Sequence, residues 1–204
     1  MSPPKTRGKP ASRRLVVGIS GASGAIYGIR LLETLRSLGV ETHLVVSKAA
    51  EMTIGYETDM TPAAVKALAD VVYPVSDVGA AIASGSFPSL GMIVAPCSVR
   101  SMAEIATGMT SSLLTRAADV TLKERRRLVL MLRETPLHSG HLNNMLALSN
   151  MGAVIAPPVP AFYARPTSLI DMVDHSIGRV LDLFGMDNGR VRRWGEKPAT
   201  RKPR

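Results

Sequence analysis

The sequence predicts a single α/β domain, a three-layer sandwich in which helices cover both faces of a mostly parallel sheet. Short apolar runs alternate with stretches of helical periodicity along the chain, which is typical of repeated βα units. The length of 204 residues suits one domain. Hydrophobic residues make up 46% of the chain, enough to build a sizeable core, and this content excludes a disordered protein.

The first half of the chain predicts three strands and three helices. Gly39 closes the first helix, because glycine is the usual residue just after a helix end. Thr61 followed by Pro62 is typical of a helix start, and Pro74 suits an edge strand. The expected strands are 14–19, 40–46 and 71–75, and the expected helices are 26–38, one from about 48, and 61–70.

The second half continues the alternation. A buried strand ends at Pro96, and a proline-rich loop over 157–166 precedes the terminal helix. That helix ends at Gly185, and its apolar residues recur every three or four positions, from Ile170 to Phe184. The expected strands are 91–95, 128–132 and 153–156, and the other expected helices are 98–106, 111–123 and 142–151.

Charge is concentrated in the two ends of the chain. The formal net charge is +9, yet residues 1–14 hold five bases and no acid, and residues 189–204 hold seven bases and one acid. The body between them is slightly acidic, which disfavours nucleic-acid binding by a basic face. We expect a basic tail over 1–13, the folded domain over 14–187, and a C-terminal segment with a second basic tail over 188–204.

Several functional classes lack support. A lone cysteine, Cys97, excludes an internal disulfide and fits a reducing, cytoplasmic setting. No apolar run approaches the ~20 residues of a membrane span. The four histidines show no zinc-binding spacing, so we expect no metal site.

Polar residues follow nearly every predicted strand. The carboxyl ends of parallel strands share one edge of the sheet, which we call the rim, and ligands of open α/β sheets bind there. Hydroxyls, amides and an arginine at one rim suit a phosphate, and the first loop places backbone N–H groups at a helix start. The segments that meet there are 20–24, 47–48, 96–98, 133–134 and 157–158.

The rim does not match the common nucleotide fingerprints. Glycines at 18, 21 and 24 do not form the dinucleotide pattern, and no P-loop motif occurs. Ser47 and Lys48 stand where a NAD site would place an acid, so a mononucleotide phosphate fits better. Plainer interpretations stay open: the glycine loop as a packing turn, Ser98 as a helix cap, Cys97 as a small buried residue, and Arg133 with Glu134 as a salt bridge.

Beyond these patterns, the sequence resembles the flavin prenyltransferase (UbiX-type) family, whose members were formerly labelled aromatic-acid decarboxylases. GISGASGAIYGIRLLETL, THLVVSKAA, APCSVRSMAEIATG and the long segment over 113–166 carry the resemblance, which covers 14–196. RETPL and PPVPAFY are its most specific motifs. The family's fold is a Rossmann-like flavoprotein fold, and its members assemble as homo-oligomers, described as dodecamers.

The resemblance implies an enzyme that joins a dimethylallyl group from dimethylallyl phosphate to N5 and C6 of reduced FMN. The product, prenylated FMN, serves a separate UbiD-type decarboxylase. The implied FMN contacts are Gly21, Ala22, Ser23, Ser47, Ser98, Val99, Arg100, Ser101 and Arg133. The implied ligands of the prenyl phosphate are Tyr163, Arg179, Lys123 and Arg116, and the implied catalytic residues are Glu134, Lys123 and Ser23.

Two other classes compete with this interpretation. An FMN-dependent decarboxylase acting on a cysteine would use a histidine before the P-C-S segment, and residues 71–90 contain none. A non-catalytic flavin carrier needs the rim but not Lys123, Tyr163 and Arg179 together.

Tyr163 and Trp194 are the candidate aromatic residues around an allyl cation, and Trp194 as a packing anchor is the alternative.

Overall fold

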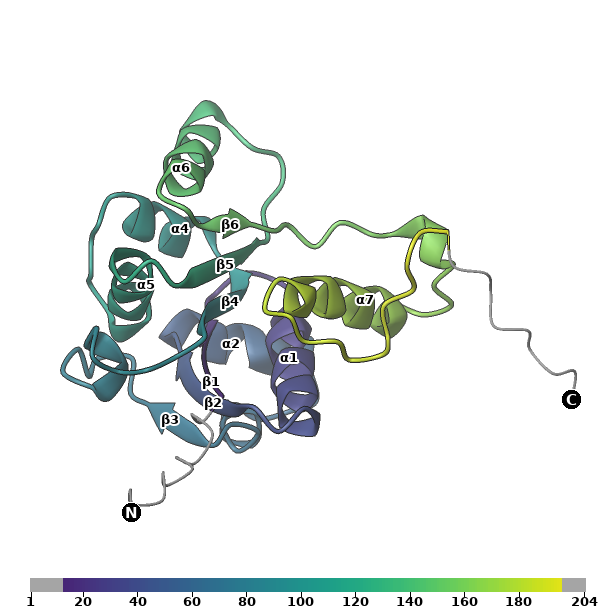
Figure 1. The fold of residues 1–204 in the computed structure, drawn as a ribbon, viewed down its shortest axis with the longest axis horizontal. Coiled ribbons are helices and arrows are strands. Elements are labelled where there is room, and N and C mark those ends of the chain that lie inside the picture. The colour runs from purple at the N-terminus through teal and green to yellow at the C-terminus, as the bar shows by residue number, and fades with distance from the viewer. Residues whose placement is uncertain (1–12, 196–204) are drawn as a thin grey trace, which may run out of the picture.

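Six parallel strands form the central sheet of the computed structural model, which describes residues 13–195 (Figure 1). Their order across the sheet is β3-β2-β1-β4-β5-β6, so the first strand lies at the centre beside the fourth. The chain therefore reverses its direction of progress between β1 and β4. The strands are β1 (Arg14–Ile19), β2 (Glu41–Val46), β3 (Val71–Tyr73), β4 (Gly91–Cys97), β5 (Arg127–Leu132) and β6 (Val154–Ile155).

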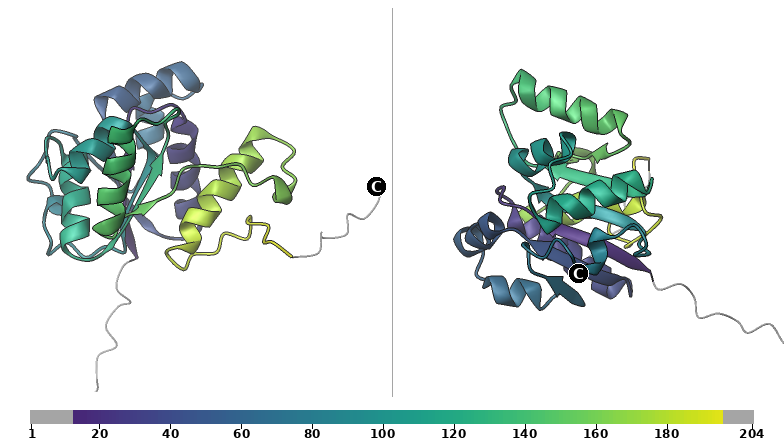
Figure 2. Two further views of the ribbon diagram at one scale, coloured as in Figure 1. Left: turned by 90° about the horizontal axis from the view of Figure 1, so that it is seen from above. Right: turned by 90° about the vertical axis from the view of Figure 1, so that its left-hand side faces the viewer.

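Helices cover both faces of this sheet and complete the predicted sandwich (Figure 2). One face carries α1 (Ala25–Ser37), α2 (Lys48–Glu57), α3 (Pro62–Lys66) and α7 (Leu169–Asp182). The other carries the short 3-10 turn η1 (Ala81–Ala83), α4 (Val99–Ala106), α5 (Leu113–Lys123) and α6 (Ser139–Asn150).

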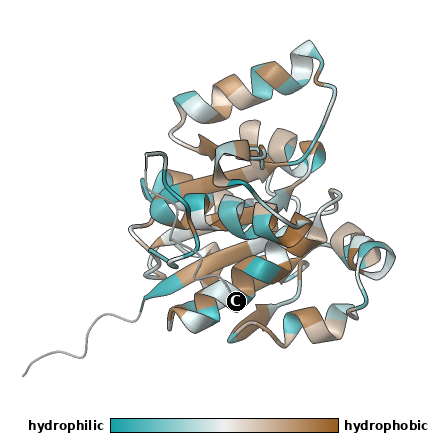
Figure 3. Ribbon diagram, turned by 90° about the vertical axis from the view of Figure 1, so that its right-hand side faces the viewer, coloured by the Kyte–Doolittle hydropathy of each residue, from teal (hydrophilic) through white to brown (hydrophobic). Residues whose placement is uncertain are grey.

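Strand residues alternate between the two resulting cores. Val17 and Ile19 pack toward α1, whereas Val16 packs toward α4 and α5. Both faces of β1 and β4 are buried, because helices lie on each side, and the strands are correspondingly hydrophobic (Figure 3). Burial of this many aliphatic side chains is the main stabilising term of the domain.

All thirteen predicted strands and helices are present, with shifts at their ends. Helix α3 stops at Lys66 rather than near Asp70, because the Asp70 carboxylate instead accepts bonds from the Thr42 amide and hydroxyl at 2.7 and 2.8 Å. Strand β4 continues through Pro96 to Cys97. Helix α6 begins three residues before the predicted start, where His138 caps it.

The final part of the described chain forms an arm, defined here as residues 157–195. It contains the proline-rich loop, the short turn η2 (Phe162–Ala164), α7 and a segment that returns along α7 (Figure 1). Asp174 of α7 accepts two bonds from Arg30 of α1, at 2.8 and 2.7 Å, and a third from Arg190 at 3.0 Å. These contacts hold the arm against the sandwich.

Parts of the two expected basic tails lie outside the described residues, namely 1–12 and 196–204. The described part of the C-terminal segment packs on α7, where Val191 stands over Gly178 so closely that a larger residue would clash. Between residues 13 and 195, no helix combines the length and the apolar character needed to cross a membrane.

Candidate active site at the rim of the sheet

A cavity of about 650 Å³ opens where the sheet reverses, between the loops that follow β1 and β4. This is the position at which open α/β sheets bind ligands, and the volume is in the range of small-molecule sites. We call it the rim cavity. It is lined by Gly21, Ala22, Ser23, Ser47, Lys48, Ala49, Val75, Ser98, Val99, Arg100, Ser101, Glu104, Ser111, Ser112, Arg133 and Glu134.

Ser20 joins the two loops beneath the rim cavity. Its side chain is buried, its hydroxyl donates to the Pro96 carbonyl at 2.9 Å, and the same oxygen accepts from the Ser98 amide at 2.7 Å. A second bond runs from the Ser20 amide to the Pro96 carbonyl at 3.2 Å. The relative position of the two loops is thus fixed before any ligand binds.

Gly21 is required by close packing of the first loop. A Cβ at this position would clash with the Ala49 side chain in the first turn of α2. The loop therefore lies directly on α2, and Ser47, the N-cap of that helix, faces the same cavity. The glycine pattern thus has a packing role, and it also lets the backbone line the cavity.

The amino end of α1 departs from the sequence-based expectation. The Gly24 and Ala25 amides both donate to Glu57, at 2.7 and 3.1 Å, so a carboxylate of the protein occupies the position predicted for a ligand phosphate. Burial alone would raise the pKa of Glu57, but hydrogen bonds from Ser23, Gly24 and Ala25 and the nearby Arg133 charge hold that pKa below its usual value. These two amides are therefore not free to bind a phosphate.

The second wall of the rim cavity begins at the start of α4. Ser98 caps this helix by accepting from the Ser101 amide at 3.2 Å, and its hydroxyl also donates to the Ser101 hydroxyl at 3.2 Å. The expected capping role of Ser98 is present, and both serines nevertheless line the cavity. Capping and ligand contact are thus compatible.

Arg133 and Glu134 emerge from β5 onto the rim, as predicted. Among residues 13–195 neither forms an ion pair, so the alternative of a salt bridge between them is wrong. The Glu134 carboxylate accepts only from the adjacent Thr135 amide, at 3.0 Å. Arg133 lies near Gly24 and Glu57, and both charged side chains remain available to a ligand.

All nine predicted FMN contacts and Glu134 line this one cavity. The predicted ligands of the prenyl phosphate do not. Arg116 lies in the first turn of α5 and pairs with Asp119 at 2.8 Å. Lys123 ends the same helix, where it pairs with Glu124 beside Gly85, about 10 Å from Arg116 along the helix axis. Their predicted roles stay predictions.

Tyr163 and Arg179 lie in the arm, where they share a cavity of about 300 Å³ that also includes Met131, His175 and Leu183. The Tyr163 ring packs edge-on against Trp194, with ring centroids 5.4 Å apart, so the two candidate aromatic residues are in contact. The Tyr163 hydroxyl is 3.5 Å from His175 Nε2.

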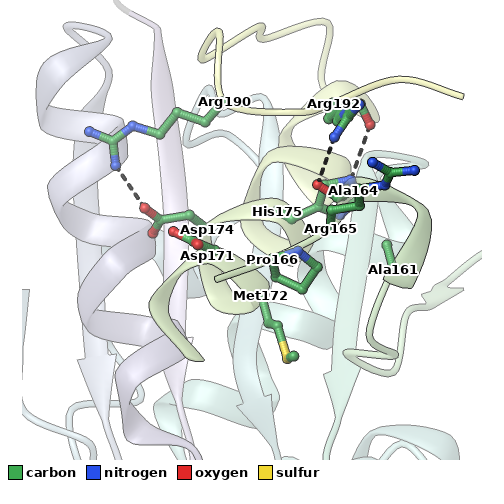
Figure 4. A pocket seen from close by; sticks show the side chains of 10 residues that line it. All are labelled: Ala161, Ala164, Arg165, Pro166, Asp171, Met172, Asp174, His175, Arg190 and Arg192. Carbon is green, nitrogen blue, oxygen red and sulfur yellow. Dashed lines mark hydrogen bonds and ion pairs between the residues drawn. The ribbon is translucent and has the colours of Figure 1, made fainter. Parts of the chain in front are cut away.

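A neighbouring cavity of about 340 Å³ lies on the other side of His175 (Figure 4). It shares Ala161 and His175 with the cavity of Tyr163 and Arg179. Its two carboxylates are engaged, Asp174 by Arg190 and Asp171 by the start of α7.

Cys97 has the structural role expected for a lone cysteine. Its side chain is fully buried at the end of β4, and burial raises the pKa of the thiol to about 12. A thiol of that pKa is not a nucleophile at neutral pH. Within the described part of the chain, no three His, Cys, Asp or Glu side chains cluster in a way that would bind a metal ion.

Four polar residues of the site were not predicted from the sequence. Glu57 lies within the range of the resemblance but carries no pattern that links it to α1. Glu104, Ser111 and Ser112 line the rim cavity from α4 and from the segment before α5. Ser112 is detectable as a helix cap, since it forms a capping box with Thr115, but its exposure to the cavity is not.

Comparison with known proteins gives consistent matches. The family model described as Flavoprotein matches residues 4–181. The flavin prenyltransferase UbiX of Thauera aromatica is 56% identical over 181 residues, covering 89% of this chain and 93% of that protein.

Two solved structures are also similar over most of the chain. A UbiX protein in complex with FMN and dimethylallyl pyrophosphate has a TM-score of 0.90 at 55% identity, covering 92% of this chain and 100% of that one. A dodecameric FMN-dependent UbiX-like decarboxylase from Escherichia coli O157:H7 has a TM-score of 0.88 at 50% identity, covering 90% and 100% respectively.

Proposed function

The chain belongs to the UbiX-type flavin prenyltransferase family of flavoproteins, and on that premise we propose that it joins a dimethylallyl group from dimethylallyl phosphate to N5 and C6 of reduced FMN. The product is prenylated FMN. The rim cavity carries this proposal, because it gathers all nine residues predicted to contact FMN at the reversal point of the sheet.

The residues of the rim cavity fit a flavin mononucleotide. The hydroxyls of Ser47 and Ser101 supply donors for phosphate and ribityl oxygens, and the Ser98 hydroxyl, which donates to Ser101, orients it. Arg133 supplies a positive charge that forms no ion pair among residues 13–195. The backbone at Gly21 and Ala22 offers a close approach without a bulky side chain. Bound reduced FMN supplies the nucleophilic N5 and C6 atoms.

Positively charged side chains can stabilise the leaving phosphate of the prenyl donor without a metal ion. As the allylic carbon–oxygen bond breaks, the electron pair leaves with the phosphate and positive charge develops on carbon. Lys123, Arg116 and Arg179 are the proposed donors to the leaving phosphate, with the Tyr163 hydroxyl, and Tyr163 with Trp194 supplies aromatic faces for the allyl cation. Glu134, which has no ion-pair partner in the described chain, is the proposed proton donor to the phosphate or the positioner of its arginine ligands.

The separate positions of these residues support an oligomer. Lys123 lies at the end of α5 opposite the rim, and Tyr163 and Arg179 line a cavity that shares no residue with the rim cavity. We infer that copies of the chain complete one another's sites, with the dodecamer of the UbiX-like relative as the proposed assembly. Exposed apolar residues of the arm, among them Phe162, Leu169 and Trp194, are available for such contacts.

The proposed cellular setting follows from the product and from the cysteine content. A UbiD-type decarboxylase is the proposed recipient of prenylated FMN. We place the enzyme in the cytoplasm, in keeping with a single buried thiol and with the bacterial relatives. No nucleic acid is proposed as a partner, because the body of the chain carries no excess of positive charge.

The direct test is anaerobic incubation of the purified protein with reduced FMN and dimethylallyl phosphate, followed by mass spectrometry of the released flavin. A gain of one dimethylallyl unit that requires the prenyl phosphate would support the transferase. FMN that is bound but unchanged would contradict it and favour a flavin carrier or a cysteine-type decarboxylase. A parallel reaction with dimethylallyl pyrophosphate would define the donor.

A further inference from the structure

We propose that Glu104 is a positioning residue that fixes the segment between α4 and α5 as one wall of the flavin cavity. This inference rests on the proposed function, since it assigns Glu104 a role in binding FMN. The segment comprises residues 107–112, and two of its serines, Ser111 and Ser112, line the rim cavity. Neither Glu104 nor these serines belongs to the expected set of FMN contacts.

Both carboxylate oxygens of Glu104 are engaged. Ser111 donates its hydroxyl to Oε2 at 2.7 Å, and Arg100 donates Nε to Oε1 at 2.9 Å. The side chain of Glu104 is only 14% exposed, whereas that of Arg100 is 85% exposed. The carboxylate therefore sits in the wall of the cavity, between a cation at its mouth and the loop that leads to α5.

The backbone of Glu104 holds the same segment. Its carbonyl accepts from the Met109 amide at 2.8 Å and from the Thr107 hydroxyl at 3.3 Å. The far end of the segment is fixed separately, because the Leu113 amide donates to the Val75 carbonyl at 2.8 Å. Glu104 is thus the anchor at the near end, and its side chain is what reaches Ser111.

A charge argument supports a role beyond packing. A carboxylate facing a cavity that binds a phosphate ester would repel the ligand unless it is neutralised. Arg100 neutralises Glu104, and the Ser111 bond turns the second oxygen toward the loop. The arrangement keeps the wall close to neutral and the serine hydroxyls fixed.

Loss of the carboxylate should therefore raise the cost of ordering the wall when FMN binds. A flexible wall pays conformational entropy at binding, which lowers affinity without altering the bond-making groups. The chemistry at Glu134 and at the prenyl phosphate should be little affected. This expectation separates a positioning residue from a catalytic one.

The experiment measures FMN affinity of the full-length protein by fluorescence titration, for Glu104→Ala, Ser111→Ala and the double variant. Removal of either partner of a hydrogen bond to a charged group should weaken FMN binding about five- to tenfold. The double variant should be no weaker than Glu104→Ala, because both changes break the same contact. In steady-state assays the same variants should raise the KM for flavin, which is the kinetic parameter that weaker flavin binding changes.

Two controls make the test specific. Ser111→Thr keeps the hydroxyl and should bind FMN as the wild type does. Ser86→Ala removes a similar hydroxyl that bonds to Ser84 and does not line the rim cavity. This change should leave FMN affinity unaltered. Melting temperatures of all variants establish that they fold. If Glu104→Ala does not fold, Ser111→Ala alone tests the inference.

Unchanged FMN affinity in Glu104→Ala and Ser111→Ala, or an equal loss in Ser111→Thr, would overturn the inference while leaving the proposed function intact. A wild-type protein that binds FMN but forms no prenylated product would overturn the proposed function alone, because the readout here is flavin affinity.

Discussion

Single side chains of the rim divide into those that build the cavity and those left available to a ligand. Ser20 bridges two loops and is fully used by the protein itself, whereas Gly21 makes a close packing contact and also lines the cavity with its backbone. Arg133 and Glu134 form no ion pair within the described chain, although both are charged and stand at the end of a strand. Charged groups kept without partners at a site are candidates for chemistry.

Glu134 provides the first residue-scale prediction. Glu134→Gln keeps the size and the acceptor of the side chain but cannot exchange a proton at neutral pH. If Glu134 transfers a proton to the leaving phosphate, single-turnover prenylation should slow by about a hundredfold or more. FMN affinity should remain within about twofold of wild type. Unchanged turnover would assign Glu134 no proton-transfer role.

Glu57 provides the second residue-scale prediction. Glu57→Gln weakens the bonds to the first amides of α1, and because the side chain is exposed, solvent screening limits the loss to about 0.5–1 kcal/mol of unfolding free energy. The pKa of Glu57 is lowered in the folded state, so its contribution is present above the ordinary value of 4.5 and is lost as pH falls through the folded-state pKa.

Denaturant unfolding of wild type and Glu57→Gln at about pH 7 and about pH 3 checks the Glu57 prediction. The stability difference should be clear at the higher pH and should shrink at the lower one. An equal difference at both values would show that the carboxylate charge is not what α1 requires.

At the scale of elements, periodicity and capping residues were sufficient to predict every strand and helix of the sandwich. Thr61 and Ser98 cap the helices that they were expected to begin. Helix α3 ends early because Asp70 bonds to a neighbouring strand, a tertiary contact that local patterns do not contain. The turns η1 and η2 were not predicted, since three-residue 3-10 turns leave little periodic signal.

The pairing of α1 with α7 gives an element-scale prediction. Asp174 is 16% exposed and engages Arg30 and Arg190, so Asp174→Asn leaves Arg30 with Glu33 alone and removes the carboxylate that Arg190 contacts. We expect a loss of about 1–3 kcal/mol in unfolding free energy. Relative to wild type, the rate of hydrogen exchange should increase more in α7 than in α5.

The matched control for the arm is Glu33→Gln, which removes the more exposed partner of the same Arg30. An exposed pair of this kind is worth about 0–1 kcal/mol, so the change should be small. If both variants lose the same stability, Asp174 does not hold the arm in place.

At the scale of the whole molecule, sequence patterns predicted which residues meet at the rim cavity, but they did not bring the proposed ligands of the prenyl phosphate together with it. The rim could be predicted because parallel strands deliver their carboxyl ends to one edge, so the residues after each strand necessarily converge. Tyr163 and Arg179 followed only from the family resemblance, because no rule of strands or helices relates the arm to the rim, whereas the seven-residue spacing of Arg116 and Lys123 on one helix already allowed both to face an anion. In the folded chain Tyr163, Arg179 and Lys123 remain apart from the rim cavity.

That separation predicts complementation between inactive copies. If one copy supplies the rim and another supplies Lys123, then Glu134→Gln and Lys123→Gln damage different contributors to each site. Mixed in equal amounts, unfolded and refolded together, they should recover roughly a quarter of wild-type prenylation, the chance that a two-copy site draws both intact residues. The activity should require mixing, and light scattering should show the same assembly for both variants. Activity no higher than that of the two variants assembled separately would place Lys123 and Glu134 in the same copy, or Lys123 outside the reaction.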